Sequence, residues 1–245
     1  MDQTKLPGTN TAAPIIISPK GVAGVLAWCI VLLSLGHIAA FTEDYVRHAW
    51  SRTAKNIIKW FDFNLESNVP TWFSVIILAF AAMLFFIIYC HKKRSLIKGA
   101  HYWLTLCFIF LFLSMDESVQ VHEEVAKILQ PSVGIKLSGF LYWAWVVPYG
   151  VFVIAAAVYF LRFVLSLSVQ TRNLFILAGG LYVFGALILE FPEGYFYLKY
   201  GLDHIYNRIL YFVEELCEMS GVSVLIYALL NYMASNNIVL VIKNG

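Results

Sequence analysis

The acidic residues of this chain gather in three short strings at the ends of apolar segments. The first string is SMDESVQVHEE at 114–124, the second is EFPE at 190–193, and the third is EELCEM at 214–219. Carboxylates and imidazole bind divalent metal ions and transfer protons in enzyme active sites. The candidate site residues in these strings are Asp116, Glu117, His122, Glu190, Glu214, Glu215 and Glu218.

Helical spacing decides which of these side chains can act together. Glu214 and Glu218 share a face, because residues four apart lie on the same side of a helix. Glu218 is also the most deeply placed carboxylate, two to three turns inside the last apolar segment. His122 stacks on Ser118 rather than on Asp116, so an undistorted helix cannot offer both Asp116 and His122 to one metal ion.

Several carboxylates with one or two imidazoles suit ions such as Zn, Fe or Mn. We therefore expect a divalent metal as cofactor, and we assign Glu218 and Asp116 as catalytic and Glu117, His122, Glu190, Glu214 and Glu215 as metal ligands. Helical di-iron proteins carry a Glu-x-x-His pair, and this sequence has none. The di-iron version of the site is therefore disfavoured.

The opposing interpretation is that these acids are merely solvated at helix ends. Surface positions are expected for Glu43, Asp62, Glu66, Glu123, Glu124 and Asp203. Glu214 and Glu215 would lie in the first turns of a helix, where the macrodipole favours negative charge. An ionised carboxylate at membrane depth nevertheless costs several kcal/mol unless it is paired, hydrated, protonated or metal-bound. That cost favours a functional role for Glu218.

The elements that position these residues must be membrane helices. Of 245 residues, 60% are hydrophobic and 13% are charged, and the mean hydropathy is +0.74. A soluble domain carries roughly twice that charged fraction, and a membrane span needs about 20 apolar residues. The predicted fold is an all-α, polytopic membrane helical bundle of about six spans.

Six apolar segments are the predicted spans: 21–41, 71–90, 99–115, 139–163, 173–189 and 209–233. They form one domain over 21–235, with cytoplasmic tails at 1–20 and 236–245. The segment 45–69 has apolar residues at helical spacing with basic residues between them, which predicts either an interfacial helix or a folded loop. Pro148 is expected to kink the fourth span and Pro192 to end the fifth.

The basic residues predict the orientation. Nine Lys and Arg and one acid fall on the side of the N-terminus, and fourteen acids with eight bases fall on the other side. The loop 91–98 carries four of these nine and is the clearest positive-inside signal. Both termini are therefore expected in the cytoplasm, with an uncleaved first helix. On the outer side the first span would add His37, Glu43, Asp44 and His48 to the acidic helix ends.

The strings at 112–123 and 214–221 resemble a family of uncharacterised multi-spanning proteins of bacterial inner membranes. That resemblance implies an inner-membrane location and no established activity. The Ser118-x-x-x-His122 spacing is also similar to one element of membrane hydrolases of the alkaline-ceramidase type. The His-x-x-x-His of that superfamily is absent from the sequence.

Three function classes stay open on this sequence. The leading one is a divalent-metal-dependent membrane enzyme that acts on a lipid or another membrane-soluble substrate. The others are a cation- or proton-coupled transporter and a non-catalytic subunit of a membrane complex. The expected partners are membrane lipids and other membrane subunits rather than nucleic acid.

Overall fold

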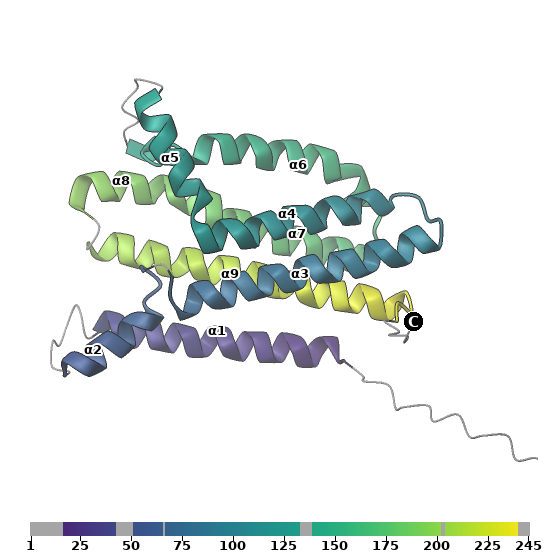
Figure 1. Ribbon diagram of the computed structural model, residues 1–245, viewed down its shortest axis with the longest axis horizontal. Coiled ribbons are helices and arrows are strands. Elements are labelled where there is room, and N and C mark those ends of the chain that lie inside the picture. The colour runs from purple at the N-terminus through teal and green to yellow at the C-terminus, as the bar shows by residue number, and fades with distance from the viewer. Residues whose placement is uncertain (1–16, 43–50, 66, 133–138, 202–203, 240–245) are drawn as a thin grey trace, which may run out of the picture.

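The computed structural model describes residues 17–42, 51–65, 67–132, 139–201 and 204–239, and the regular structure within these ranges is helical. The elements are α1 (Pro19–Thr42), α2 (Arg52–Ile58), η2 (Lys59–Phe61), α3 (Val69–Arg94), α4 (Ala100–Val119), α5 (Val121–Ser132), η3 (Gly139–Leu141), α6 (Val146–Ser166), α7 (Val169–Val183), η4 (Phe184–Leu189), α8 (Glu190–Tyr200) and α9 (Ile205–Ser235). Figure 1 shows the long helices as one bundle of roughly parallel rods, which confirms the predicted all-α fold.

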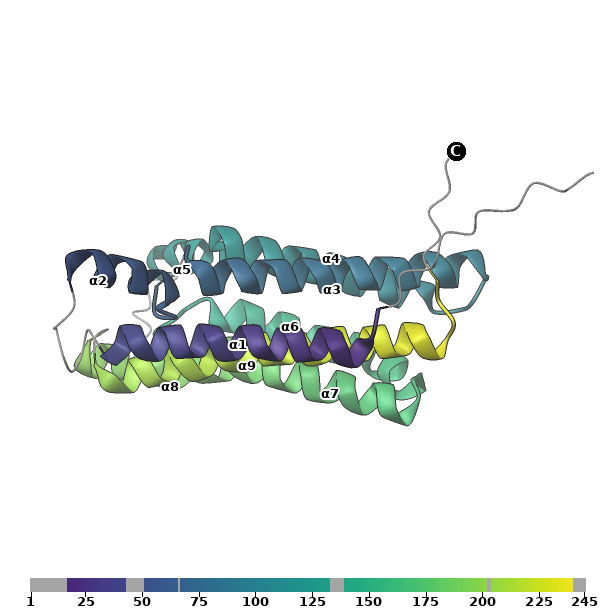
Figure 2. The ribbon, with the colours of Figure 1, turned by 90° about the horizontal axis from the view of Figure 1, so that it is seen from below.

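The long helices alternate in direction along the chain. The start of α1 and the end of α9 lie at the same end of the bundle, together with the α3–α4 and α6–α7 connections (Figures 1 and 2). The end of α4, the end of α8 and the start of α9 lie at the opposite end (Figure 1). The three acidic strings belong to these last elements, so the up-and-down arrangement brings them to one end of the bundle.

Within the part of the chain that the structure describes, five helices are long and apolar enough to cross a membrane: α1, α3, α4, α6 and the continuous helix Val169–Tyr200. Their outward faces carry large apolar side chains, such as Trp28 at 69% exposure, Trp72 at 67% and Val158 at 70%. Contact of such surface with water costs roughly 25 cal/mol per Å², whereas contact with lipid tails carries no such cost. The length and the exposed apolar surface of these helices therefore indicate a membrane protein.

The sixth predicted span corresponds to α9, a helix of 31 residues that is not among those five. It packs against α1, α3 and α7, and Met219, Ile226 and Leu229 on it have no exposed surface. Protein therefore covers α9 where lipid covers much of the other long helices. A central, covered helix is a suitable place for polar residues within an apolar bundle.

Two predictions about prolines are wrong. Residues 139–145 form a 3₁₀ turn and a bend, and α6 begins at Val146, so Pro148 lies in the first turn of a helix and kinks nothing. A proline fits there because the first helical N–H groups have no partner within the helix. Pro192 does not end the fifth helix, which continues through the π-helical turn η4 and through α8 as far as Tyr200.

The segment 45–69, predicted to be either an interfacial helix or a folded loop, is helical only in part. Residues 45–50 lie outside the described residues, and α2 with η2 covers 52–61. The hydroxyl oxygen of Ser51 accepts a hydrogen bond from the backbone N of Ala54 and begins α2, and the side chain of Asn68 caps α3 in the same way through Thr71. Between these caps the chain turns back onto the end of α1, so it does not form one long surface helix.

Candidate functional site

A cavity of about 1000 Å³ lies between α4, α6, α7 and α9 and reaches the acidic end of the bundle. Its lining includes all seven candidate residues: Asp116, Glu117, His122, Glu190, Glu214, Glu215 and Glu218. The acid-bearing ends of the third, fifth and sixth predicted spans therefore meet in space. The described residues of α1, by contrast, contribute nothing to the lining, and Glu43, Asp44 and His48 lie outside the described residues.

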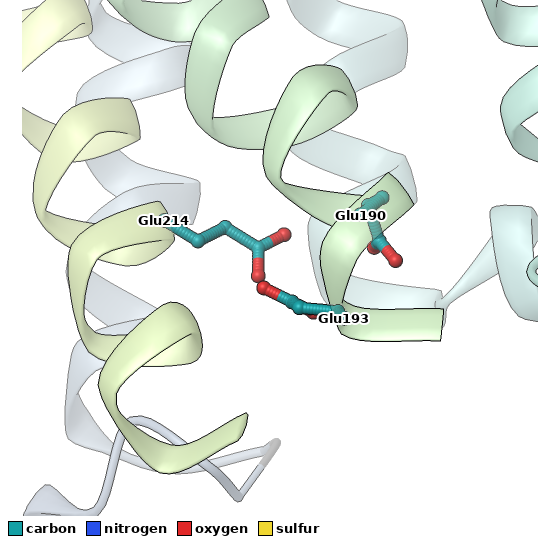
Figure 3. A group of neighbouring side chains, drawn as sticks. All are labelled: Glu190, Glu193 and Glu214. Atoms are coloured by element: carbon teal, nitrogen blue, oxygen red, sulfur yellow. The ribbon is translucent and has the colours of Figure 1, made fainter. Parts of the chain in front are cut away.

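Three glutamates form the tightest acidic group near this cavity. One carboxylate oxygen from each of Glu190, Glu193 and Glu214 lies within 4.8 Å of the other two. Figure 3 shows Glu193 on α8 and Glu214 on α9 pointing toward each other, with Glu190 one turn from Glu193. Carboxylates that converge over this range can share one cation or a proton.

Glu193 makes this group unlike a solvated cluster. It has no exposed surface, and neither of its carboxylate oxygens has a hydrogen-bond donor among the described residues. An ionised carboxylate is only an acceptor, so the neighbouring carboxylate of Glu214 cannot satisfy it unless a proton or a cation lies between them. A buried acceptor without a donor is costly, and this carboxylate therefore requires such a partner.

The sequence reasoning missed Glu193. Glu190 and Glu193 are three residues apart, which places them on one helical face only if the helix continues past Pro192. The expectation that Pro192 ends the helix concealed that spacing. The signal was nevertheless present, because a proline early in a helical stretch does not forbid the helix that follows it.

Two glycines allow α9 to approach the helix that carries Glu190 and Glu193. A Cβ atom on Gly185 would lie 2.8 Å from the carbonyl oxygen of Glu214 and 3.0 Å from Cγ of Glu218. A Cβ atom on Gly221 would lie 2.9 Å from the carbonyl oxygen of Ala178. Small residues let backbones approach closely in membrane bundles. Gly221 therefore leaves room for the backbone of α7 to approach α9.

The π-helical turn η4 determines the direction in which the two α8 glutamates point. A π turn holds one more residue than an α turn, and one residue corresponds to about 100° of rotation at 3.6 residues per turn. All residues after η4 are therefore rotated relative to a continuous α-helix. With that rotation, Glu190 and Glu193 face Glu214 on α9.

Asp116 and His122 form a second polar group in the cavity wall. The chain leaves α4 at Gln120, which has left-handed backbone angles of φ 57° and ψ 46°, and begins α5 at Val121. This break turns His122 back toward Asp116. The carboxylate oxygen Oδ1 of Asp116 lies 2.8 Å from the backbone N of His122 and 3.3 Å from its Nδ1. The expectation that His122 stacks on Ser118, away from Asp116, is therefore wrong, because the helix is broken between them.

Tyr149 on α6 completes this second group. Its hydroxyl donates to Oδ2 of Asp116 at 3.1 Å, so both carboxylate oxygens of Asp116 accept hydrogen bonds. With the Nδ1 proton of a neutral imidazole donated to Asp116, the lone pair of His122 lies on Nε2. A carboxylate that orients a histidine in this way is common both behind metal ligands and behind general bases.

The remaining candidates, Glu117, Glu215 and Glu218, also line the cavity. Glu117 and Glu190 are close enough for their charges to act on Glu218, although they belong to other helices. Among the described residues, seven acids, one lysine and one histidine line the cavity. The lysine, Lys127, is 62% exposed and pairs with Glu124 at 2.7 Å. The lining is therefore strongly negative and favours cations or protons.

Asp62 lies in a separate polar cluster and is not the surface residue that we expected. It is 4% exposed, and its Oδ1 lies 3.4 Å from Nδ1 of His37. Burial alone raises the pKa of Asp62, but the adjacent His37 side chain and the hydrogen bond from the backbone N of Asn64 outweigh it, so this pKa lies below its ordinary value. Glu124 is exposed, as expected, and Glu66 and Asp203 lie outside the described residues.

No curated protein and no solved structure matches this chain. One family model does, and it covers residues 24–232, from the first turns of α1 almost to the end of α9. The cavity and both of its polar groups lie wholly within this match. The chain therefore belongs to the family described as a domain of unknown function, DUF8692.

Proposed function

We propose that this protein is a divalent-metal-dependent membrane enzyme that acts on an amphiphilic substrate. The observation that carries the proposal is the fully buried Glu193, held with Glu190 and Glu214 beside a cavity of about 1000 Å³. Neither carboxylate oxygen of Glu193 has a hydrogen-bond donor among the described residues, and a carboxylate buried in this way requires a metal ion or a proton. The cavity supplies the space that a substrate would need next to such an ion.

The proposed metal ligands are Glu190, Glu193 and Glu214. All three offer carboxylate oxygens, and of Zn, Fe and Mn such donors suit Mn²⁺ best. Three protein ligands leave coordination positions for water or for a substrate oxygen. A bound divalent ion polarises a substrate oxygen or makes a bound water more acidic.

Proton transfer is assigned to residues of the same wall. Asp116 orients His122, and Glu218 is a further acid within the range of charge interaction with Glu190. Either His122 or Glu218 can accept a proton from a water or a substrate hydroxyl, provided that the group lies within about 3 Å of it. Asp116 is then a positioning residue, which acts through His122.

The proposed location is a bacterial inner membrane that the chain crosses six times, with the acidic end outward. The basic residues Lys92, Lys93, Arg94 and Lys98 lie at or near the α3–α4 connection, at the end of the bundle opposite the acids. The positive-inside rule supports a cytoplasmic location for that connection. The start of α1 and the end of α9 lie at the same end of the bundle as this connection.

Metal analysis of the detergent-purified protein tests the proposal. After incubation with Mn²⁺ and removal of free ions, we expect a stoichiometric content in the wild type and a loss of roughly tenfold or more in affinity for Glu193→Gln and Glu214→Gln. Glu124→Gln is the matched control, because Glu124 is exposed and pairs with Lys127. A folded wild type that holds no divalent metal under these conditions contradicts the proposal.

A cation- or proton-coupled transporter is the second candidate. Glu214 and Glu218 follow one face of the central helix α9, an arrangement that could pass a cation inward along the helix. Reconstitution into vesicles distinguishes the candidates. Uptake of a cation or of protons into the vesicles that Glu218→Gln abolishes would favour the transporter. Turnover of an added lipid without ion movement would favour the enzyme.

A further inference from the structure

We propose that the cavity binds an amphiphile with one long apolar chain and a cationic ammonium head group, which enters from the bilayer between α6 and α7. This proposal deepens the proposed function, since it rests on the same cavity and names the class of substrate. Binding of this amphiphile does not require a bound metal ion, and the experiment below measures that binding rather than enzymatic activity.

The cavity has two chemically distinct ends. Its lining follows α9 from Tyr211 to Leu225, a length of about 21 Å at 1.5 Å per residue. The outer part carries the acids, and the lining beyond Glu218 is apolar, with Val222 and Leu225 from α9, Phe110 from α4, Phe175 from α7 and Phe160 from α6. A volume of about 1000 Å³ is at the upper end of the usual range for ligand pockets. This shape fits a head group at the outer end and an extended chain at the inner end.

Charge decides which head group fits. Seven acids line the cavity, against one lysine and one histidine. With a divalent ion at Glu190, Glu193 and Glu214, the carboxylate of Asp116, which accepts hydrogen bonds on both of its oxygens, still lines the cavity, so an anionic head group would meet like charge. Like-charge placement costs several kcal/mol in a desolvated site. An ammonium group is attracted instead.

Aromatic rings at the same end favour the same head group. Trp145 lies 5.0 Å from the ring of His122 and 5.1 Å, edge to face, from the ring of Tyr149, whose hydroxyl reaches Asp116. Trp143 and Tyr142 also line the cavity, with their rings 4.8 Å apart. Aromatic faces beside carboxylates are the usual recognition chemistry for ammonium groups, because the ring quadrupole attracts a cation.

The side of the cavity between α6 and α7 opens toward lipid. Several residues belong both to the lining and to the exposed surface, among them Phe152 and Ala157 on α6 and Ile176 on α7. On α7, Gly179 and Gly180 also line the cavity, and a Cβ atom at either position would meet no atom within 4 Å. Figure 1 shows α6 along the outer side of the bundle. A chain lying in the bilayer therefore has a direct route into the cavity.

Native mass spectrometry of the purified protein with three probes of equal chain length tests the head group. The probes are hexadecylamine, hexadecanol and hexadecyl sulfate, each with and without a chelator. We expect the amine to bind roughly tenfold or more tightly than the sulfate. We also expect Asp116→Asn combined with Glu218→Gln to remove most of that preference while hexadecanol binding stays unchanged. Equal binding of amine and sulfate would overturn the proposal.

Bulky side chains placed in the opening between α6 and α7 test whether the amphiphile enters there. Gly180→Trp should reduce amine binding, and Gly24→Trp on α1 is the matched control, because Gly24 also has open space in front of its Cβ position and lies away from the cavity. Ala157→Trp fills the same opening from α6 and serves if Gly180→Trp does not fold. Equal binding by the folded variants and the control would rule out this entry route. If the protein binds the amine selectively but binds no metal, the proposed amphiphile site is supported and the proposed metal-dependent activity is contradicted.

Discussion

A carboxylate oxygen of Glu193 on α8 lies within 4.8 Å of one of Glu214 on α9, and Glu193 has no exposed surface. Two ionised carboxylates so placed repel each other in a medium that screens poorly. The folded chain therefore stabilises this pair only with a proton or a cation between them.

Glu193→Gln should stabilise the metal-free protein and destabilise the metal-loaded one relative to wild type. Without metal, the neutral amide removes repulsion worth about 1 kcal/mol or more. With Mn²⁺ at a hundred times its Kd, only the wild type should gain about 2.7 kcal/mol. Thermal unfolding with chelator and with Mn²⁺ should show the order of the two Tm values reversing. The same order under both conditions would mean that Glu193 holds no metal.

Gly221→Ala should destabilise the bundle, because the new Cβ atom would lie 2.9 Å from backbone atoms of Ala178 and Tyr182. Overpacking of this kind costs about 1–3 kcal/mol. Gly24→Ala is the matched control, since it meets no atom within 4 Å and should gain up to about 1 kcal/mol of helix propensity. Unfolding measured in detergent should separate the two variants. Equal stability of the two would show that α9 and α7 do not approach so closely.

Gln120→Gly should stabilise the protein slightly. Gln120 has a φ of 57°, and a left-handed conformation costs a residue other than glycine roughly 1–2 kcal/mol. Val119→Gly, one residue earlier and within α4, should instead lose about 1 kcal/mol. Chemical denaturation of both variants checks this. Destabilisation by both would indicate that α4 continues through Gln120 and that His122 does not turn back to Asp116.

Asp62→Asn should destabilise the protein at neutral pH, and the difference from wild type should disappear in acid. The folded state lowers the pKa of Asp62 below 3.8, so the unfolded state binds the proton more readily. The stabilisation is therefore complete well above 3.8 and is lost as pH falls through the folded pKa. Tm values measured from about pH 7 down to about pH 3 should converge for the two proteins. A difference that is constant over this range would contradict the lowered pKa of Asp62 in the folded state.

The sequence was sufficient for the helical fold and for the meeting of the acids, because both follow from apolar length and alternating direction. Asp116 lies near the C-terminal end of α4 and Glu214 in the N-terminal half of α9, so helices of alternating direction bring them to the same end of the bundle. The details that depend on local backbone geometry were not predictable in this way. The break at Gln120 carries no glycine or proline. The π turn before Glu190 contains Gly185 and is followed by Pro192, but neither residue by itself specifies a π turn. Both features change the direction in which a side chain points without changing its position in the sequence, so the residue spacing does not reveal them.

The burial of Asp62 was hidden for a related reason. The acid follows a short amphipathic helix, and its partner, His37, lies 25 residues away on a helix whose sequence is otherwise apolar. Periodicity describes one element at a time, so it cannot reveal a pair that forms only when two elements pack. The same holds for Glu193, whose burial depends on contact between α8 and α9.

The assembly of the acidic site depends on a single residue within the π turn Phe184–Leu189. A π turn is equivalent to one residue inserted into an α-helix, and a single insertion or deletion is among the simplest genetic changes. Removing one residue from this turn would keep every carboxylate in the chain and leave the helix long enough to cross a membrane. It would also rotate Glu190 and Glu193 together by about 100° away from Glu214. The meeting of the three glutamates is thus encoded by the length of one helix as much as by the identity of its acids.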